Sequence, residues 1–195
     1  NNIMSEFNQQ EQNNSAHFVK KNLKQITAFL VILVLIVGGY FGYLELYQKP
    51  REIKAADAMF AAENYFFQDS SKLVLNGDGT SKGVLYIIKT YSGTKAENLA
   101  NFYAGVSYYK LGDLNKSIQY LKDFSTDAKQ IQSIAYGTLG DAYADLKKNT
   151  EALDYYKKAG ANFPEDEVIS SEYLFRAAQL QEVLGKTDDA VAIYK

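Results

Sequence analysis

Hydrophobic residues are distributed along this chain in two different ways. Over 25–45 the sequence QITAFLVILVLIVGGYFGYLE has no Asp, Glu, Lys, Arg or His between Lys24 and Glu45. A helix rises about 1.5 Å per residue, so about 20 residues span the 30 Å hydrocarbon core of a bilayer. After residue 50 the apolar residues recur every three to four positions, which predicts amphipathic helices. The pattern therefore predicts a transmembrane helix over 25–45 and a helical body after it.

The flanking charges favour a cytoplasmic N-terminus for this segment. Lys20, Lys21 and Lys24 closely precede it, and three further basic residues follow between positions 49 and 54. Basic flanks stay inside, and a long C-terminal body can be translocated regardless of its charge. The apolar run is longer than a signal-peptide core, and no small-residue cleavage site follows it. We expect 1–24 to be a polar cytoplasmic tail and the body to lie across the membrane.

Three glycines lie in the second half of the apolar segment. Gly38 and Gly42 form a small-xxx-small pair, with Gly39 beside them. Such pairs allow two membrane helices to approach closely. We therefore expect these glycines to pack against a helix of a membrane partner.

The body is an internal repeat. Segments 102–124, 138–164 and 176–195 each contain an apolar helical run, a short polar turn and a second helix. Aligning the turns superposes Gly112, Lys147 and Gly185, which gives periods of 35 (147 − 112) and 38 (185 − 147) residues. The expected fold is all-α: a single N-terminal transmembrane helix followed by an α-solenoid of antiparallel helix pairs.

A degenerate helical hairpin is expected over 51–96, before the clear repeats. Its first helix would cover 51–70 and its short second helix 83–94, with KLVLNGDGTSKG (72–83) as an insertion. The solenoid proper would then cover 98–195, about two and a half repeats. The last copy ends inside its second helix, and further helices are expected to follow.

The repeats resemble the tetratricopeptide repeat (TPR). Small Gly140 and Ala152 would face each other and let the two helices of the second copy approach closely, while Tyr143 and Tyr156 fill the space beside them. Pro164 would stop the second helix. The residues that carry the motif are Leu139, Gly140, Tyr143, Ala152, Tyr156, Ala159 and Pro164 in the second copy, Gly105 and Tyr108 in the first, and Ala178 and Ala190 in the third.

In TPR proteins the first helix of each repeat lines a groove that binds a partner. Carried over position by position, the resemblance implies a groove of Leu99, Phe102, Val106, Tyr109, Ile134, Asp141, Phe175 and Arg176. Some TPR proteins hold a chaperone's terminal carboxylate with Lys and Asn at fixed positions. Among those positions only Arg176 is basic here, so a carboxylate clamp is not expected. A partly apolar, partly acidic groove suits an extended or hydrophobic polypeptide.

The composition excludes several other classes of function. The chain has no cysteine, which rules out disulfides, thiol chemistry and a lipoprotein anchor. The net charge is −2, and no basic face of the size that nucleic acid requires is visible. The stretch NGDGTSKG has Ile87 where a calcium-binding EF-hand loop needs its glutamate. With no nucleophile–base pair and no metal-ligand cluster, we expect neither an enzyme nor a cofactor.

The whole layout resembles the bacterial inner-membrane TPR proteins of the YfgM type. The resemblance covers residues from about 20 to 195 and implies an ancillary subunit of the Sec translocon. Such a subunit associates with a membrane-anchored periplasmic foldase and assists exported polypeptides. Two alternatives remain open: an envelope-assembly scaffold that does not touch translocating chains, and a receptor whose repeats face the cytoplasm. Co-purification and topology mapping would separate the three.

Overall fold

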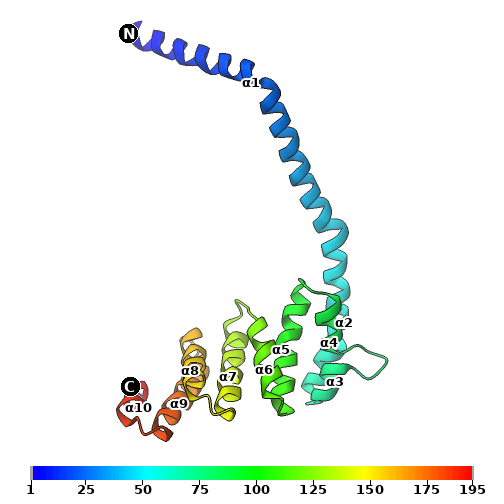
Figure 1. The fold of residues 1–195 in the computed structure, drawn as a ribbon, viewed down its shortest axis with the longest axis vertical. Helices are drawn as coiled ribbons and strands as arrows, with labels where there is room; N and C mark the ends of the chain where they lie inside the picture. The colour runs from blue at the N-terminus through cyan, green and yellow to red at the C-terminus, as the bar shows by residue number, and fades with distance from the viewer. Residues whose placement is uncertain (1, 195) are drawn as a thin grey trace. The chain divides into compact units, whose positions relative to one another are not determined.

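A computed structural model describes residues 2–194 of the chain and the side chains of 20–194. Residues 1 and 195, the outer limits of the predicted tail and solenoid, lie outside this part. Every named element within it is a helix, which confirms the all-α prediction (Figure 1). The chain divides into two compact units, Asn1–Pro50 and Arg51–Lys195.

The first unit is helical throughout its described part. Helix α1 (Asn2–Tyr43) is followed by the π-helical segment η1 (Leu44–Gln48), so the predicted tail is continuous with the apolar segment. The large apolar side chains between Phe29 and Tyr43 are exposed. By length and composition alone, the helical run Lys20–Phe67 is a candidate membrane span, and none of its apolar window is buried.

The second unit is a series of helix pairs that lie side by side in chain order (Figure 1). Side chains of Thr94, Asp113 and Asp166 accept hydrogen bonds at helix N-termini, as N-cap residues do. The helices are α2 (Lys49–Phe67, which enters from the first unit), α3 (Ser71–Asn76), α4 (Val84–Thr90), α5 (Lys95–Lys110), α6 (Leu114–Asp123), α7 (Lys129–Asp145), α8 (Asn149–Asn162), α9 (Glu167–Val183) and α10 (Thr187–Tyr194).

The turns inside the pairs share one backbone geometry. Gly112, Lys147 and Gly185 have φ of 79°, 60° and 73°, in the left-handed region. In each turn this residue's N–H donates to the carbonyl three residues back, and the next N–H donates to the carbonyl five residues back, at 2.9–3.0 Å. These two bonds close a helix C-terminus that ends on a left-handed residue. The alignment of the three turns made from the sequence is therefore confirmed.

The same turn recurs at Asp69, whose φ is 56°. It is followed directly by α3, so the second helix of the first hairpin starts at Ser71. This corrects the prediction that 72–83 is an insertion throughout. Only the loop between α3 and α4 interrupts the pair, and Gly77 forms an antiparallel bridge with Lys82 at its neck.

Two clusters of buried side chains form the core of the second unit. One joins α2, α3, α4 and α5 around Met59, Val74 and Ile87. The other runs through α5 to α9 around Leu121 and Leu139. Half-buried aromatic and aliphatic side chains of α2 and α5 pack against both clusters, so the solenoid has a continuous core.

Candidate partner-binding face

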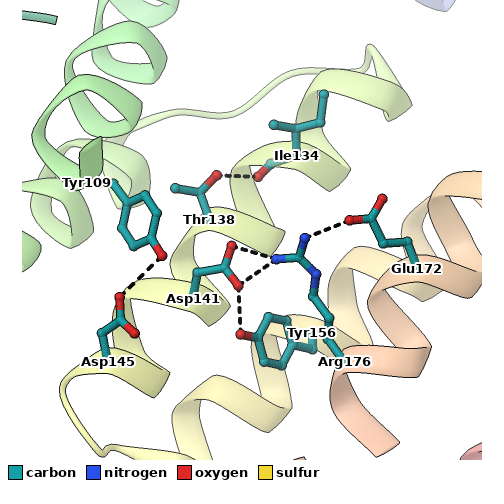
Figure 2. A network of polar contacts seen from close by, with 8 residues as sticks. All are labelled: Tyr109, Ile134, Thr138, Asp141, Asp145, Tyr156, Glu172 and Arg176. Carbon is teal, nitrogen blue, oxygen red and sulfur yellow. Dashed lines mark hydrogen bonds and ion pairs between the residues drawn. The ribbon is translucent and has the colours of Figure 1, made fainter. Parts of the chain in front are cut away.

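The first helices of successive pairs, α5, α7 and α9, lie next to one another. We call the surface that they share the first-helix face. Of the predicted groove residues, the structure brings Tyr109, Asp141 and Arg176 together there, one from each helix (Figure 2). Ile134 and Phe175 lie on the same helices and are exposed. The ring of Phe175 lies 5.8 Å from that of Tyr194 in α10, so the other four residues form the shared surface.

Asp141 lies at the centre of a polar network on this face. The Nη1 of Arg176 donates to both carboxylate oxygens of Asp141 at 2.8 and 2.9 Å, and Nη2 donates to Glu172 at 2.6 Å. The hydroxyl of Tyr156, from α8, donates to Asp141 at 2.7 Å. The network therefore ties α7, α8 and α9 together (Figure 2). The guanidinium of Arg176 is thus already engaged by two carboxylates of the same chain, and the absence of a carboxylate clamp stays a prediction.

Burial and charge act together on the groups of the network. Burial opposes the charge of Arg176, but its hydrogen bonds to Asp141 and Glu172 outweigh this and raise the guanidinium pKa. Burial and the hydrogen bond to Asp141 raise the pKa of Tyr156. Arg176 thus stays charged and the phenol of Tyr156 stays neutral across the physiological range.

Tyr109 extends the network towards α5. Its hydroxyl donates to Asp145 at 3.2 Å. Burial, followed by the nearby charges of Asp141 and Asp145, raises the pKa of Tyr109 to about 12. A hollow of about 560 Å³ opens beside this network, lined by Asp141, Ala144, Tyr156, Arg176, Gln179, Leu180, Glu182 and Val183. The face therefore has room for a side chain next to its charged groups.

Two predicted groove residues are not part of an open surface. Phe102 and Val106 are buried in the core, contrary to the prediction. The Phe102 ring lies 6.4 Å from Phe66 of α2 and 5.2 Å from Phe124 at the end of α6, so the preceding pair and its own pair both cover it. Leu99 is half-buried and packs against both core clusters. The open part of the face therefore lies over α7 and α9.

Large side chains of other helices pack directly over glycines of the first helices. A Cβ on Gly140 would lie 2.5 Å from the Tyr156 ring, so Tyr156 lies directly over this glycine. Ala152 is fully buried in the same cluster, and its place opposite Gly140 stays a prediction. A Cβ on Gly105 would likewise meet Leu121 at 2.4 Å, and one on Gly137 would meet Tyr173 at 2.0 Å.

The remaining TPR positions lie in the core or at its edge. Leu139, Tyr143, Ala159, Ala178 and Ala190 are buried, and Tyr108 is half-buried. Pro164 follows the end of α8 by two residues, as a residue that cannot continue a helix does.

Sequence reasoning missed a repeated tyrosine stack. Tyr108 stacks on Tyr120 with ring centroids 5.5 Å apart, and Tyr143 stacks on Tyr155 at 5.4 Å. Both members of the second pair are 35 residues after those of the first. The equal spacing of the two tyrosines in each pair, 12 residues (120 − 108 and 155 − 143), was the signal in the sequence that could have predicted the stacks. The stacks join the two helices of each pair at the end where the turn lies.

No contact in the structure tests the prediction that the glycines of α1 pack against a membrane partner. Nothing lies within 4 Å of a Cβ built on Gly38, Gly39 or Gly42, so this side of α1 is open to a partner helix. Among the residues that the structure describes, no group of three metal-ligating side chains is close enough to hold an ion.

Two segments of the chain match models of a known family. Residues 99–128 and residues 134–159 each match a tetratricopeptide repeat model. They cover most of α5 together with α6, and most of α7 and α8. No curated protein matches the chain. The matches support a tetratricopeptide repeat protein and a role in protein–protein interaction.

Proposed function

We propose that this protein is a membrane-anchored, non-enzymatic TPR adaptor that holds polypeptide segments on its first-helix face. One observation carries the proposal: Ile134 is exposed on the side of α7 that bears the polar network, and this network fixes α7 against α9 (Figure 2). Exposed apolar side chains on a rigid surface supply binding energy without ordering costs at the moment of binding.

The charge of this face selects among possible segments. Asp141, Asp145 and Glu172 contribute three negative charges and Arg176 one positive charge, which leaves a net −2. Arg176 is paired with two of these carboxylates, so the group as a whole remains acidic. We infer that neutral and basic segments with apolar or aromatic side chains bind best.

The order of segments in the chain suggests where in the cell this activity takes place. A candidate span followed by a TPR body resembles the YfgM type, and we propose the same setting: a single-pass bacterial inner-membrane protein with its N-terminus in the cytoplasm and its repeats in the periplasm. There it would act beside the Sec translocon and a membrane-anchored foldase, on exported polypeptides. Gly38, Gly39 and Gly42 would form its contact with a membrane partner.

Site-specific photocrosslinking during active secretion tests the proposal. We expect a probe at position 134 to crosslink to many exported chains, and a probe at exposed position 157 on α8 to crosslink to few. Ile134→Asp should strongly reduce client crosslinks from a probe at 109, while circular dichroism stays unchanged. A single folded partner at position 134 would instead support an envelope-assembly scaffold. Labelling of the body only from the cytoplasmic side would support a receptor.

A further inference from the structure

Helix α2 carries an exposed apolar stripe outside the first-helix face. Ile53, Phe60 and Phe67 are 63%, 70% and 81% exposed and are spaced seven residues apart. They lie on the opposite side of the helix from Ala55 and Ala62, which are fully buried in the core. Most other large apolar side chains of α2 to α4 pack inward. We call these three residues the α2 stripe.

The repeat geometry shows what kind of element fits against this stripe. The shared turn at Asp69 and Gly112 relates α2 to α5 by 43 residues, so Phe60 corresponds to Tyr103. Tyr103 packs against the preceding pair, with its ring 4.7 Å from Phe66 of α2. By the same relation Ile53 corresponds to Ala96, which is buried against that pair. The α2 stripe is therefore the surface on which a preceding helix would pack.

The spacing of the stripe also favours a helix. Fourteen residues at about 1.5 Å each make the stripe about 21 Å long. Apolar residues at intervals of seven stay almost in line on a helix, so a second helix can follow them over the whole length. A loop or an extended segment has no matching period.

The charges beside the stripe distinguish between possible helices. Asp57 lies along one edge of the stripe and Glu63 along the other, by their helical positions relative to Phe60. Within the second unit the basic residues of α2 are Arg51 and Lys54, and they are turned about 180° and 120° away from Phe60. Lys49, at the start of α2, belongs to the first unit and is paired with Glu45. A second copy of this chain would bring acidic edges together, whereas a helix with basic edges would complement them.

We propose that the α2 stripe binds an amphipathic helix of another protein, with apolar residues seven positions apart and Lys or Arg beside them. The interaction buries Phe60 at its centre and leaves the first-helix face open. This surface is independent of the proposed client binding, because it lies on α2 and uses none of the residues of α7 and α9.

Two synthetic helical peptides test the proposal with the full chain in mild detergent. Both are about 21 residues long, which covers the stripe and one helical turn at either end. Both have Leu at every seventh position and at the positions three or four residues away on the same face of the helix. One has Lys beside the Leu stripe and the other has Glu. Fluorescence anisotropy of labelled peptide should show binding of the Lys peptide at least about tenfold tighter than the Glu peptide.

Substitutions then locate the site. Phe60→Asp should weaken binding of the Lys peptide by at least about tenfold, since it puts a charge at the centre of an apolar contact. The matched control is Val168→Asp, at an equally exposed apolar position on α9, and it should leave binding unchanged. Both variants should keep the helical content of the parent chain.

Several outcomes would overturn the proposal. They are equal binding of the two peptides, binding of neither, or equal effects of Phe60→Asp and Val168→Asp. The absence of native cysteine allows one further test. If Phe60→Cys forms a disulfide-linked dimer faster than Val168→Cys does, a second copy of the chain occupies the stripe instead.

Discussion

Replacing Gly140 by alanine tests whether the contact between α7 and α8 depends on the missing side chain. The new Cβ would lie 2.5 and 2.6 Å from Cδ1 and Cε1 of Tyr156. The ring cannot move away freely, because Tyr156 is buried and its hydroxyl donates to Asp141 at 2.7 Å. Since Asp141 also holds Arg176, movement of the ring would disturb the network that joins three helices.

The size of the effect follows from three contributions. Overpacking a well-filled core costs about 1–3 kcal/mol. Disturbing a hydrogen bond to a charged group costs about 1.5–3 kcal/mol. Alanine recovers about 1 kcal/mol over glycine inside a helix. The free energy of unfolding should therefore fall by about 2–5 kcal/mol, which lowers the melting temperature by about 5–15 °C in a body of this size.

Urea unfolding of the full chain in mild detergent, followed by circular dichroism and tyrosine fluorescence, measures this change. The control is Ala161→Leu, at an exposed position near the end of α8, which should stay within about 0.5 kcal/mol of the parent. Combining Gly140→Ala with Tyr156→Ala should cost less than the sum of the two, because the second change removes the clash. A loss no larger than that of the control, or strict additivity, would refute the reasoning.

Four further predictions concern other parts of the chain. Ala152→Leu should lower the free energy of unfolding by about 1–3 kcal/mol, since Ala152 is fully buried, and an effect no larger than that of the exposed control would show that its site can expand. Lys147→Gly should raise it by up to about 1 kcal/mol, because φ of 60° strains an L-residue; a fall would contradict this. Burial raises the pKa of Tyr173 to about 12, so the unfolded chain loses this proton first and stability should fall between about pH 10 and 12; the decline should flatten in Tyr173→Phe. Gly38→Leu with Gly42→Leu should reduce co-purification of a membrane partner without preventing insertion, and unchanged recovery would exclude this contact.

The sequence predicts the turns of the solenoid better than its surfaces. Gly112 and Gly185 mark left-handed positions directly, and the alignment then identifies Lys147 as a third. The helix period shows only that Phe102 and Val106 share a face. It does not show what covers that face, and here Phe66 of the preceding pair and Phe124 at the end of α6 do so. Burial between repeats is a tertiary property that local spacing does not record.

The polar network was accessible only in part. Asp141 and Arg176 could be assigned to first helices by position, but their ion pair joins residues 35 apart in two different helices. The direct contact of the Tyr156 ring with Gly140 was not predicted. The motif has small residues at both Gly140 and Ala152, and it does not say which of them a ring covers. Helix α3 was missed because six residues are too few to establish a period.

The loop between α3 and α4 is a point at which the chain can become longer without changing the solenoid. A Cβ on Gly77 would lie 2.0 Å from the Ser81 carbonyl oxygen, and one on Gly83 would lie 2.3 Å from that of Leu75, so the neck is closed as tightly as glycine permits. At the tip, the space around Gly79 is open. Each doubling of such a loop costs only about 0.6 kcal/mol in closure entropy. An epitope, a fluorophore or a whole domain inserted at Gly79 should therefore leave the spacing of every later repeat unchanged.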